Sequence, residues 1–134
     1  MIEIDNTDKV SARIGNETYR TELKTTSHTV VSDEPITLGG KNLGPSPGDF
    51  LRMSLASCTA ITLRMYANRK GWDVNNIEVT VGSEKIQSKT IFTVAIAIDG
   101  RLDVSQRQRM LQIGKLCPIH KILTGEIEVA VDLV

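Results

Sequence analysis

The sequence predicts an α+β protein in which helices cover one side of a mainly antiparallel sheet. Two observations lead to this prediction. Segments with strand-like alternation or many β-branched residues come in neighbouring pairs, as in hairpins, and segments with helical periodicity stand between and after these pairs. The expected order is strand, strand, helix, strand, strand, helix, helix, strand. The 134 residues show no shift in composition and no linker, so we expect one domain over residues 1–134.

The first third of the chain predicts a β-hairpin over residues 8–32. Residues 10–14 alternate as a strand does, Gly15 and Asn16 give a turn signal, and residues 18–32 carry many β-branched side chains. We therefore expect a short first strand and a long second one. Residues 33–47 are rich in glycine and proline, which predicts a rigid loop between the hairpin and the next element.

A long central helix is predicted over residues 47–70. Ser46 is the expected cap, Pro47 suits the first helical position, and Asp49 stands three residues after the cap. Apolar or small residues recur all round the helix, namely Phe50, Leu51, Met53, Leu55, Ala56, Cys58, Ala60, Ile61, Leu63 and Met65. We therefore expect a helix that is buried on most sides, with Cys58 deep in the molecule. One subunit of this size could hardly cover such a helix, which predicts a homodimer.

The remainder of the chain predicts a strand pair followed by two helices and a final strand, over residues 74–134. Residues 74–86 and 89–100 form the strand pair, and the second of them alternates with period two. Asp103 and Gln106 predict a capping box at the start of the next helix. Its expected apolar stripe consists of Met110, Leu111, Ile113 and Leu116.

The C-terminal part begins where Cys117 and Pro118 interrupt the helical pattern. A short helix is expected over residues 118–123, and Gly125 ends it. Residues 126–134 alternate between apolar and polar side chains, which predicts the last strand of the sheet.

Charge and hydropathy narrow the class of protein. The 16 basic and 16 acidic residues balance, and no run of like charges appears, which argues against a nucleic-acid partner. The segment from Met1 to Asp5 lacks the pattern of a signal peptide, and no apolar stretch approaches the ~20 residues of a membrane span. We therefore expect a cytoplasmic protein without a membrane partner. Thiols stay reduced in that compartment, so Cys58 and Cys117 favour catalysis, redox sensing or metal binding over a structural disulfide.

The two cysteines differ in their local surroundings. Cys117 directly precedes Pro118 at a predicted helix start, where unpaired N–H groups and the helix dipole favour a thiolate. Cys58 lies in the middle of a helix and would need a nearby cation or hydrogen-bond donor to become an attacking thiolate. Sequence chemistry alone therefore makes Cys117 the better attacking group. In the alternative reading, each cysteine is a small apolar residue that fills the core.

Metal and cofactor sites are not expected. His28 and His120 accompany the two cysteines, but no pair of these residues has the spacing of zinc ligands. His120 follows Cys117 by three residues on one helical face, so it either touches that thiol or lies at the surface. The glycines at positions 39, 40 and 44 lack the spacing of a phosphate-binding loop.

Several motifs, taken in order, carry a family resemblance. They are Asp33-Glu34-Pro35, Gly39-Gly40, Gly44-Pro45-Ser46-Pro47, Leu55-Ala56-Ser57-Cys58-Thr59-Ala60 and Cys117-Pro118-Ile119-His120. With these motifs the sequence resembles the OsmC/Ohr family, the osmotically induced and organic hydroperoxide resistance proteins, from about residue 19 to residue 134. The two cysteine contexts together are far more specific than either one alone.

The resemblance implies an OsmC-like fold and an intertwined homodimer with its sites at the subunit interface. It also implies a thiol-dependent peroxidase for small organic hydroperoxides. In such an enzyme Cys58 would be the peroxidatic cysteine, Cys117 the resolving cysteine, and a dithiol the reductant. No cofactor is implied. The alternative is a non-catalytic binding or redox-sensing protein that holds an apolar ligand in a pocket at the dimer interface.

The sequence departs from the family at the groups that assist the thiol. The family's peroxidases carry a glutamate ten residues before the first cysteine, where this chain has Gly48. Asp49 is the nearest carboxylate, but nine residues along a straight helix place it ~180° from Cys58, so capping suits it better. The family's arginine cannot be aligned. Arg20 and Arg52 are possible substitutes, and the alternative for each is a solvated surface charge.

Overall fold

The computed structural model describes residues 9–134. Their contacts divide them into two compact units, and the boundary in the sequence lies between Met53 and Ser54. The predicted hairpin start at residue 8 and the segment from Met1 to Asp5 lie outside the described residues. The single domain of the sequence analysis stays a prediction. None of the helices in residues 9–134 is long and apolar enough to cross a membrane.

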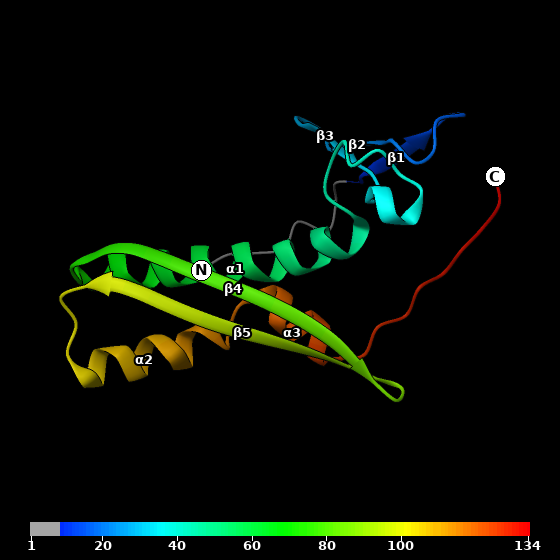
Figure 1. Ribbon diagram of the computed structural model, residues 1–134. Coiled ribbons are helices and arrows are strands. Elements are labelled where there is room, and N and C mark those ends of the chain that lie inside the picture. Colours follow the sequence, from blue (N-terminus) through cyan, green and yellow to red (C-terminus); the bar gives the residue numbers. More distant parts are fainter. Residues whose placement is uncertain (1–8) are drawn as a thin grey trace. The chain divides into compact units, whose positions relative to one another are not determined.

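The first unit contains a three-stranded antiparallel sheet in the order β1-β2-β3 (Figure 1). Its strands are β1 (Ser11–Ile14), β2 (Thr21–Lys24) and β3 (Thr29–Ser32). The single long second strand of the sequence prediction is wrong, because a turn divides it. The N–H of Thr25 donates to the His28 carbonyl at 2.9 Å, and the Thr25 hydroxyl oxygen accepts from the N–H groups of Ser27 and His28 at 3.3 and 3.0 Å.

Asp33 organises the loop that follows β3, which contains a short 3₁₀ helix, η1 (Ile36–Leu38). The residue is 2% exposed, although its environment is polar. Its carboxylate accepts hydrogen bonds from four backbone N–H groups, those of Tyr19, Glu34, Lys41 and Leu43. Glycine and proline limit the conformations of this loop, and the carboxylate selects one of them. Ser32 and Asp33 are the buried residues among residues 9–53, so this described part of the unit has no buried apolar core.

The network around Asp33 predicts sensitivity to acid. Burial tends to raise the pKa of the Asp33 carboxyl, but the hydrogen bonds from the backbone outweigh it and hold the pKa below the ordinary value. A lowered folded-state pKa adds stability at pH values above the unfolded-state pKa of about 3.9, and this stability is lost as the pH falls through the folded value. Asp33→Asn should therefore lower the melting temperature at pH 7 and flatten its decline in acid, as scanning calorimetry can measure.

A matched control is Asp73→Asn. Asp73 is an exposed aspartate whose ion pair with Arg101 is 3.7 Å long. Its replacement should leave both the melting temperature and the acid profile close to those of the natural chain. Identical profiles for Asp33→Asn and the natural chain would contradict the role given to the Asp33 carboxylate.

The central helix α1 (Pro47–Lys70) has the predicted bounds. One stripe of it is buried, consisting of Leu55, Cys58, Thr59, Thr62, Leu63, Tyr66 and Ala67. The expectation of burial on most sides is not met within the described residues, because α1 also exposes Leu51, Met53, Ile61 and Met65 at 42–48%. The cause is geometric, since the other elements of this chain cover a single face of the helix.

The second unit contains a long antiparallel hairpin, β4 (Val74–Ile86) and β5 (Lys89–Gly100), and two further helices, α2 (Val104–Gly114) and α3 (Pro118–Thr124). Figure 1 shows the hairpin running along the helices. Its core joins α1, the hairpin and α2 through Leu63, Tyr66, Ala67, Val74, Met110 and Ile113, with Ile77, Ile96 and Ile98 packed against them. The predicted α+β class, with helices and antiparallel sheet, is confirmed.

The start of α2 agrees with the capping signals predicted from the sequence. The side chain of Asp103 accepts from the Gln106 N–H at 2.7 Å, and the side chain of Gln106 accepts from the Asp103 N–H at 2.9 Å, which is the predicted capping box. The predicted stripe of α2 is half right. Met110 and Ile113 are buried, whereas Leu111 and Leu116 are 54% and 40% exposed, because their positions turn away from the core.

The last strand is the clearest difference from the sequence prediction. Residues 126–134 contain no strand, and their apolar side chains are exposed, with Val129 at 78% and Val131 at 85%. A strand forms only when its backbone groups pair with a neighbouring strand, and residues 9–134 of this chain offer the segment no such partner. The alternating pattern places apolar residues on one side of the segment. Strand formation also requires the edge of a neighbouring strand, which this pattern cannot predict.

Candidate functional site

The two cysteines lie in one cluster of the second unit, although they are 59 positions apart in the sequence. Cys58 lies in the middle of α1, and Cys117 is the residue that caps the start of α3. Together with Leu55 they form one apolar cluster, against which Val81, Phe92, Ile119 and Leu123 pack. Both thiols are free, and they are 7% and 0% exposed.

Two hydrogen-bond donors point at the sulfur of Cys117. The N–H of His120 donates to its Sγ at 3.3 Å, within the first turn of α3, and the buried hydroxyl of Thr59 donates at 3.6 Å. Donors directed at a sulfur stabilise negative charge on it. Sequence analysis anticipated the contribution of the helix start but missed Thr59. The position of Thr59 next to Cys58 in the sequence was the available signal.

The thiol of Cys58 has the opposite environment. Burial raises its pKa, and this effect is the largest. The N–H of Ile119 lowers the pKa, whereas the hydrogen bond and charge interaction with Cys117 raise it, and the hydroxyl of Thr62 lowers it slightly. The net result is a raised pKa for Cys58. None of these influences comes from a cation, so the described surroundings favour the neutral thiol.

An apolar pocket of about 240 Å³ adjoins the cysteine cluster. Leu55, Phe92 and Leu123 belong both to its lining and to the packing around the two thiols. The side chain of His120 also lines it, while the backbone of the same residue contacts Cys117. The pocket therefore combines apolar walls with one titratable side chain next to the thiols, as a site for a small organic molecule does.

Asp49 and Arg52 lie together at the start of α1, in the unit that ends at Met53. The Asp49 carboxylate accepts from the Ser46 N–H at 3.0 Å, and the Ser46 hydroxyl oxygen accepts from the Asp49 N–H at 3.2 Å, so the pair forms a capping box. Arg52 Nη2 donates to Asp49 Oδ1 at 2.8 Å. The Ser46 N–H and then Arg52 hold the pKa of Asp49 below its ordinary value. Gly48, at the position of the family's glutamate, lies beside this ion pair, because a Cβ at Gly48 would be 3.5 Å from the Arg52 guanidinium.

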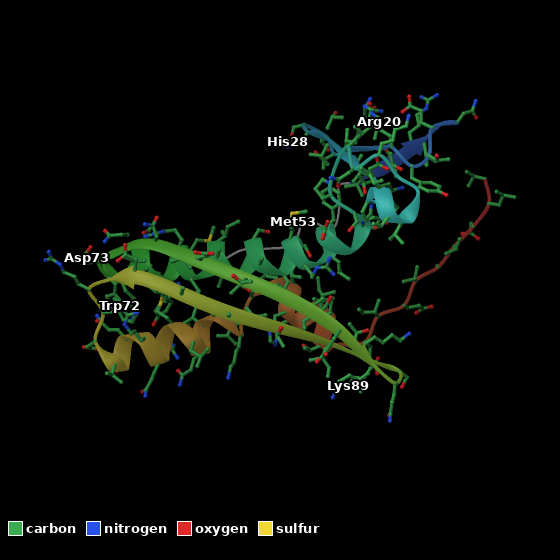
Figure 2. All side chains as sticks on the ribbon, in the orientation of Figure 1. Arg20, His28, Met53, Trp72, Asp73 and Lys89 are labelled. Carbon is green, nitrogen blue, oxygen red and sulfur yellow. The ribbon has the colours of Figure 1, made fainter. Side chains whose placement is uncertain are left out.

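Arg20 and His28 belong to the first unit, whereas the cysteines belong to the second (Figure 2). Arg20 is exposed and lines a broad pocket of about 620 Å³ with Arg13 and Lys41. The Nδ1 atom of His28 lies 3.1 Å from the Ser27 hydroxyl. Across residues 9–134, no three His, Cys, Asp or Glu side chains are grouped as metal ligands would be.

Comparisons with known proteins point to one family. The model of the family described as OsmC-like protein matches residues 39–132. No curated protein matches the chain at a significant level.

Solved structures share the fold. An OsmC-like protein from Mycoplasma pneumoniae is 17% identical, with a TM-score of 0.77 and coverage of 91% of this chain and 90% of that one. An organic hydroperoxide resistance protein OsmC from Legionella pneumophila is 19% identical, with a TM-score of 0.64 and coverage of 92% and 93%. The organic hydroperoxide resistance protein OhrB of Bacillus subtilis is 21% identical, with a TM-score of 0.60 and coverage of 89% and 91%.

Proposed function

The chain belongs to the OsmC-like protein family, and we propose that it is a thiol-dependent peroxidase that reduces small organic hydroperoxides through Cys58 and Cys117. One observation carries the proposal. Two free thiols from α1 and α3 interact with each other inside an apolar cluster, next to a pocket of about 240 Å³. Similarity to proteins named for organic hydroperoxide resistance supports this class of substrate.

The proposed reaction has three balanced steps. The Cys58 thiolate attacks one oxygen of the hydroperoxide, the O–O bond breaks, and the alcohol leaves after taking up a proton, so that Cys58 becomes a sulfenic acid. The Cys117 thiol then attacks the sulfenic sulfur, which forms a disulfide and releases water. A dithiol reductant exchanges with this disulfide, becomes a disulfide itself and returns both cysteines to thiols.

The described residues support different steps. Leu55, Phe92 and Leu123 would hold the organic group of the peroxide by apolar contact. His120 would supply the proton that the leaving alcohol needs. The Thr59 hydroxyl and the His120 N–H stabilise Cys117 as the leaving thiolate when the disulfide is reduced.

The test is a thiol titration before and after one equivalent of cumene hydroperoxide. We expect the rapid loss of two thiols per chain and their return with an added dithiol. The rate should rise with pH through the alkaline range, because the raised pKa of Cys58 leaves little thiolate at neutral pH. Cumyl alcohol, which has the same organic group but no O–O bond, is the matched control and should consume no thiol. Two unchanged thiols after peroxide treatment would contradict the proposal.

Two observations favour the second candidate, a non-catalytic binding or redox-sensing protein. The pKa of Cys58 is raised by burial, and Gly48 replaces the assisting glutamate of the family's peroxidases. The binding protein would bind cumyl alcohol in the apolar pocket and retain both thiols in the titration, whereas the peroxidase would lose them.

We also propose that the chain acts as a homodimer in the cytoplasm, where thiols stay reduced. Support comes from the exposed apolar face of α1, from the exposed apolar side chains of residues 126–134, and from the lack of a buried apolar core in the described part of the first unit.

A further inference from the structure

The helix α3 has weaker support than the other α-helices of the second unit. It is seven residues long, and none of its residues is buried. A helix of this length is not stable by itself in water, so it depends on its cap and on the packing of Ile119 and Leu123 against the cysteine cluster. By contrast, α1 is 24 residues long and carries a buried stripe that includes Cys58.

The first turn of α3 is capped by the two sulfur atoms. The first N–H groups of a helix have no partner within it, and a polar side chain usually accepts from them. Pro118, at the first position, has no N–H. The N–H of Ile119 interacts with the thiol of Cys58. The N–H of His120 donates to Cys117 Sγ at 3.3 Å. Both reacting sulfurs therefore take the place of an ordinary capping side chain.

A disulfide between the two cysteines would remove this cap. The thiols are free in the structure, and a disulfide would bring the two sulfurs to about 2.0 Å with a restricted geometry. Because Cys58 is held in the middle of α1, the sulfur of Cys117 has to move toward it. That movement takes Cys117 Sγ away from the His120 N–H and from the Thr59 hydroxyl, which donates to it at 3.6 Å. Both donors then lose their acceptor.

Reduction of the disulfide also requires a movement near the cysteines. Cys117 is 0% exposed and Cys58 is 7% exposed, whereas thiol–disulfide exchange needs direct contact between the attacking sulfur and a sulfur of the disulfide. Three residues of α3, namely His120, Leu123 and Thr124, line the pocket beside the cluster. Loosening of α3 would therefore open the wall of this pocket and uncover the disulfide.

We propose that α3 is a redox-controlled gate of the thiol site, which is folded over the reduced cysteines and frays when Cys58 and Cys117 form a disulfide. The inference rests on the redox pair of the proposed function. In the oxidised chain the open gate releases the alcohol and admits the dithiol reductant. When the reductant has returned both cysteines to thiols, their sulfurs again cap the first turn, and α3 closes over the site.

The test is amide hydrogen exchange, measured by NMR on the full chain before and after oxidation with diamide. Diamide accepts the two electrons and two protons that the thiols give up and becomes a hydrazine, so the disulfide forms without a peroxide. We expect the amides of residues 119–123 to exchange at least about fivefold faster in the oxidised chain, because a helix cap is lost. The capping box of Asp103 and Gln106 in α2 contains no sulfur, so the Gln106 amide should exchange equally in both states.

Two variants separate the loss of the cap from other effects of oxidation. Cys117→Ser keeps a side-chain acceptor for the His120 N–H but cannot form the disulfide, so diamide should leave the exchange of α3 unchanged. Cys117→Ala also lacks the thiol but has no acceptor, and its α3 should exchange about fivefold faster than that of Cys117→Ser without any oxidant. The natural chain tests the gate by itself, so the experiment remains decisive even if a variant does not fold.

Equal exchange of α3 in the reduced and oxidised natural chain would overturn the proposal. Equal acceleration of the Gln106 amide would also overturn it, because the whole unit would then have loosened. The same holds if excess diamide forms no disulfide between Cys58 and Cys117. None of these measurements uses a peroxide. A chain that fails the cumene hydroperoxide test can therefore still show the gate, and a chain without the gate can still be a peroxidase.

Discussion

Cys58→Ser is expected to lower the steady-state rate of cumene hydroperoxide consumption by more than about a thousandfold, because a serine hydroxyl at neutral pH is a far weaker nucleophile than a thiolate. The fold should survive, since serine is close in size to cysteine, although the buried position predicts some loss of stability. The measurement is peroxide consumption with an excess of dithiol. Ser57→Ala, at the neighbouring exposed position, is the matched control and should retain the natural rate.

Cys117→Ser should behave differently. Without the resolving thiol, one equivalent of peroxide is consumed, and Cys58 remains a sulfenic acid that dimedone traps in a mass-detectable adduct. The two cysteines would exchange roles if Cys58→Ser retained the rate and the adduct appeared on Cys117. That exchange is a physical alternative, because the N–H of His120 and the hydroxyl of Thr59 both stabilise charge on Cys117.

The second large effect concerns assembly. In sedimentation equilibrium at micromolar concentration, the chain is expected to have twice its monomer mass of 14.7 kDa. Ile61, 47% exposed on the open face of α1, is the residue to change. Ile61→Lys should weaken association by about 3 kcal/mol, roughly a hundredfold or more in the dissociation constant, because it places an unpaired charge in the interface.

Val104→Lys is the matched control for the dimer. Val104 is an apolar residue with 72% exposure at the start of α2, on a different helix from Ile61, and its replacement should leave association unchanged. A natural chain that is monomeric and stably folded would contradict the homodimer. If Ile61→Lys and Val104→Lys changed the dissociation constant equally, the exposed face of α1 would not be the interface.

The sequence by itself determined the elements whose signals are local. The bounds of α1 follow from Ser46, Pro47 and the polar residues after Ala67, and the start of α2 follows from Asp103 and Gln106. These signals act over three or four residues, within one turn of a helix, so no distant contact is needed to interpret them. The long hairpin β4–β5 was equally readable, because its alternation extends over a dozen residues.

The cysteine pair required more than local signals. Residue chemistry identified Cys58 and Cys117 as candidates for thiol chemistry but did not decide their roles. The family motifs joined the two cysteines into one predicted site. Apart from the position of Thr59 next to Cys58, the sequence contained no signal for the donors around them. Thr59, Thr62 and the N–H of Ile119 matter because α1 and α3 approach each other, and that approach depends on packing between distant segments.

Tertiary structure alone decided the points at which backbone and side-chain groups needed partners. The turn at Thr25, which divides an apparently continuous strand, is an exception, because the threonine hydroxyl forms it with N–H groups only two and three residues away, and the sequence analysis missed this local signal. The alternating residues 126–134 remained without a strand because no strand edge within residues 9–134 pairs with them. Helix signals depend on the sequence of one segment, whereas strand pairing and the burial of α1 depend on what other segments, or another copy of the chain, bring against it.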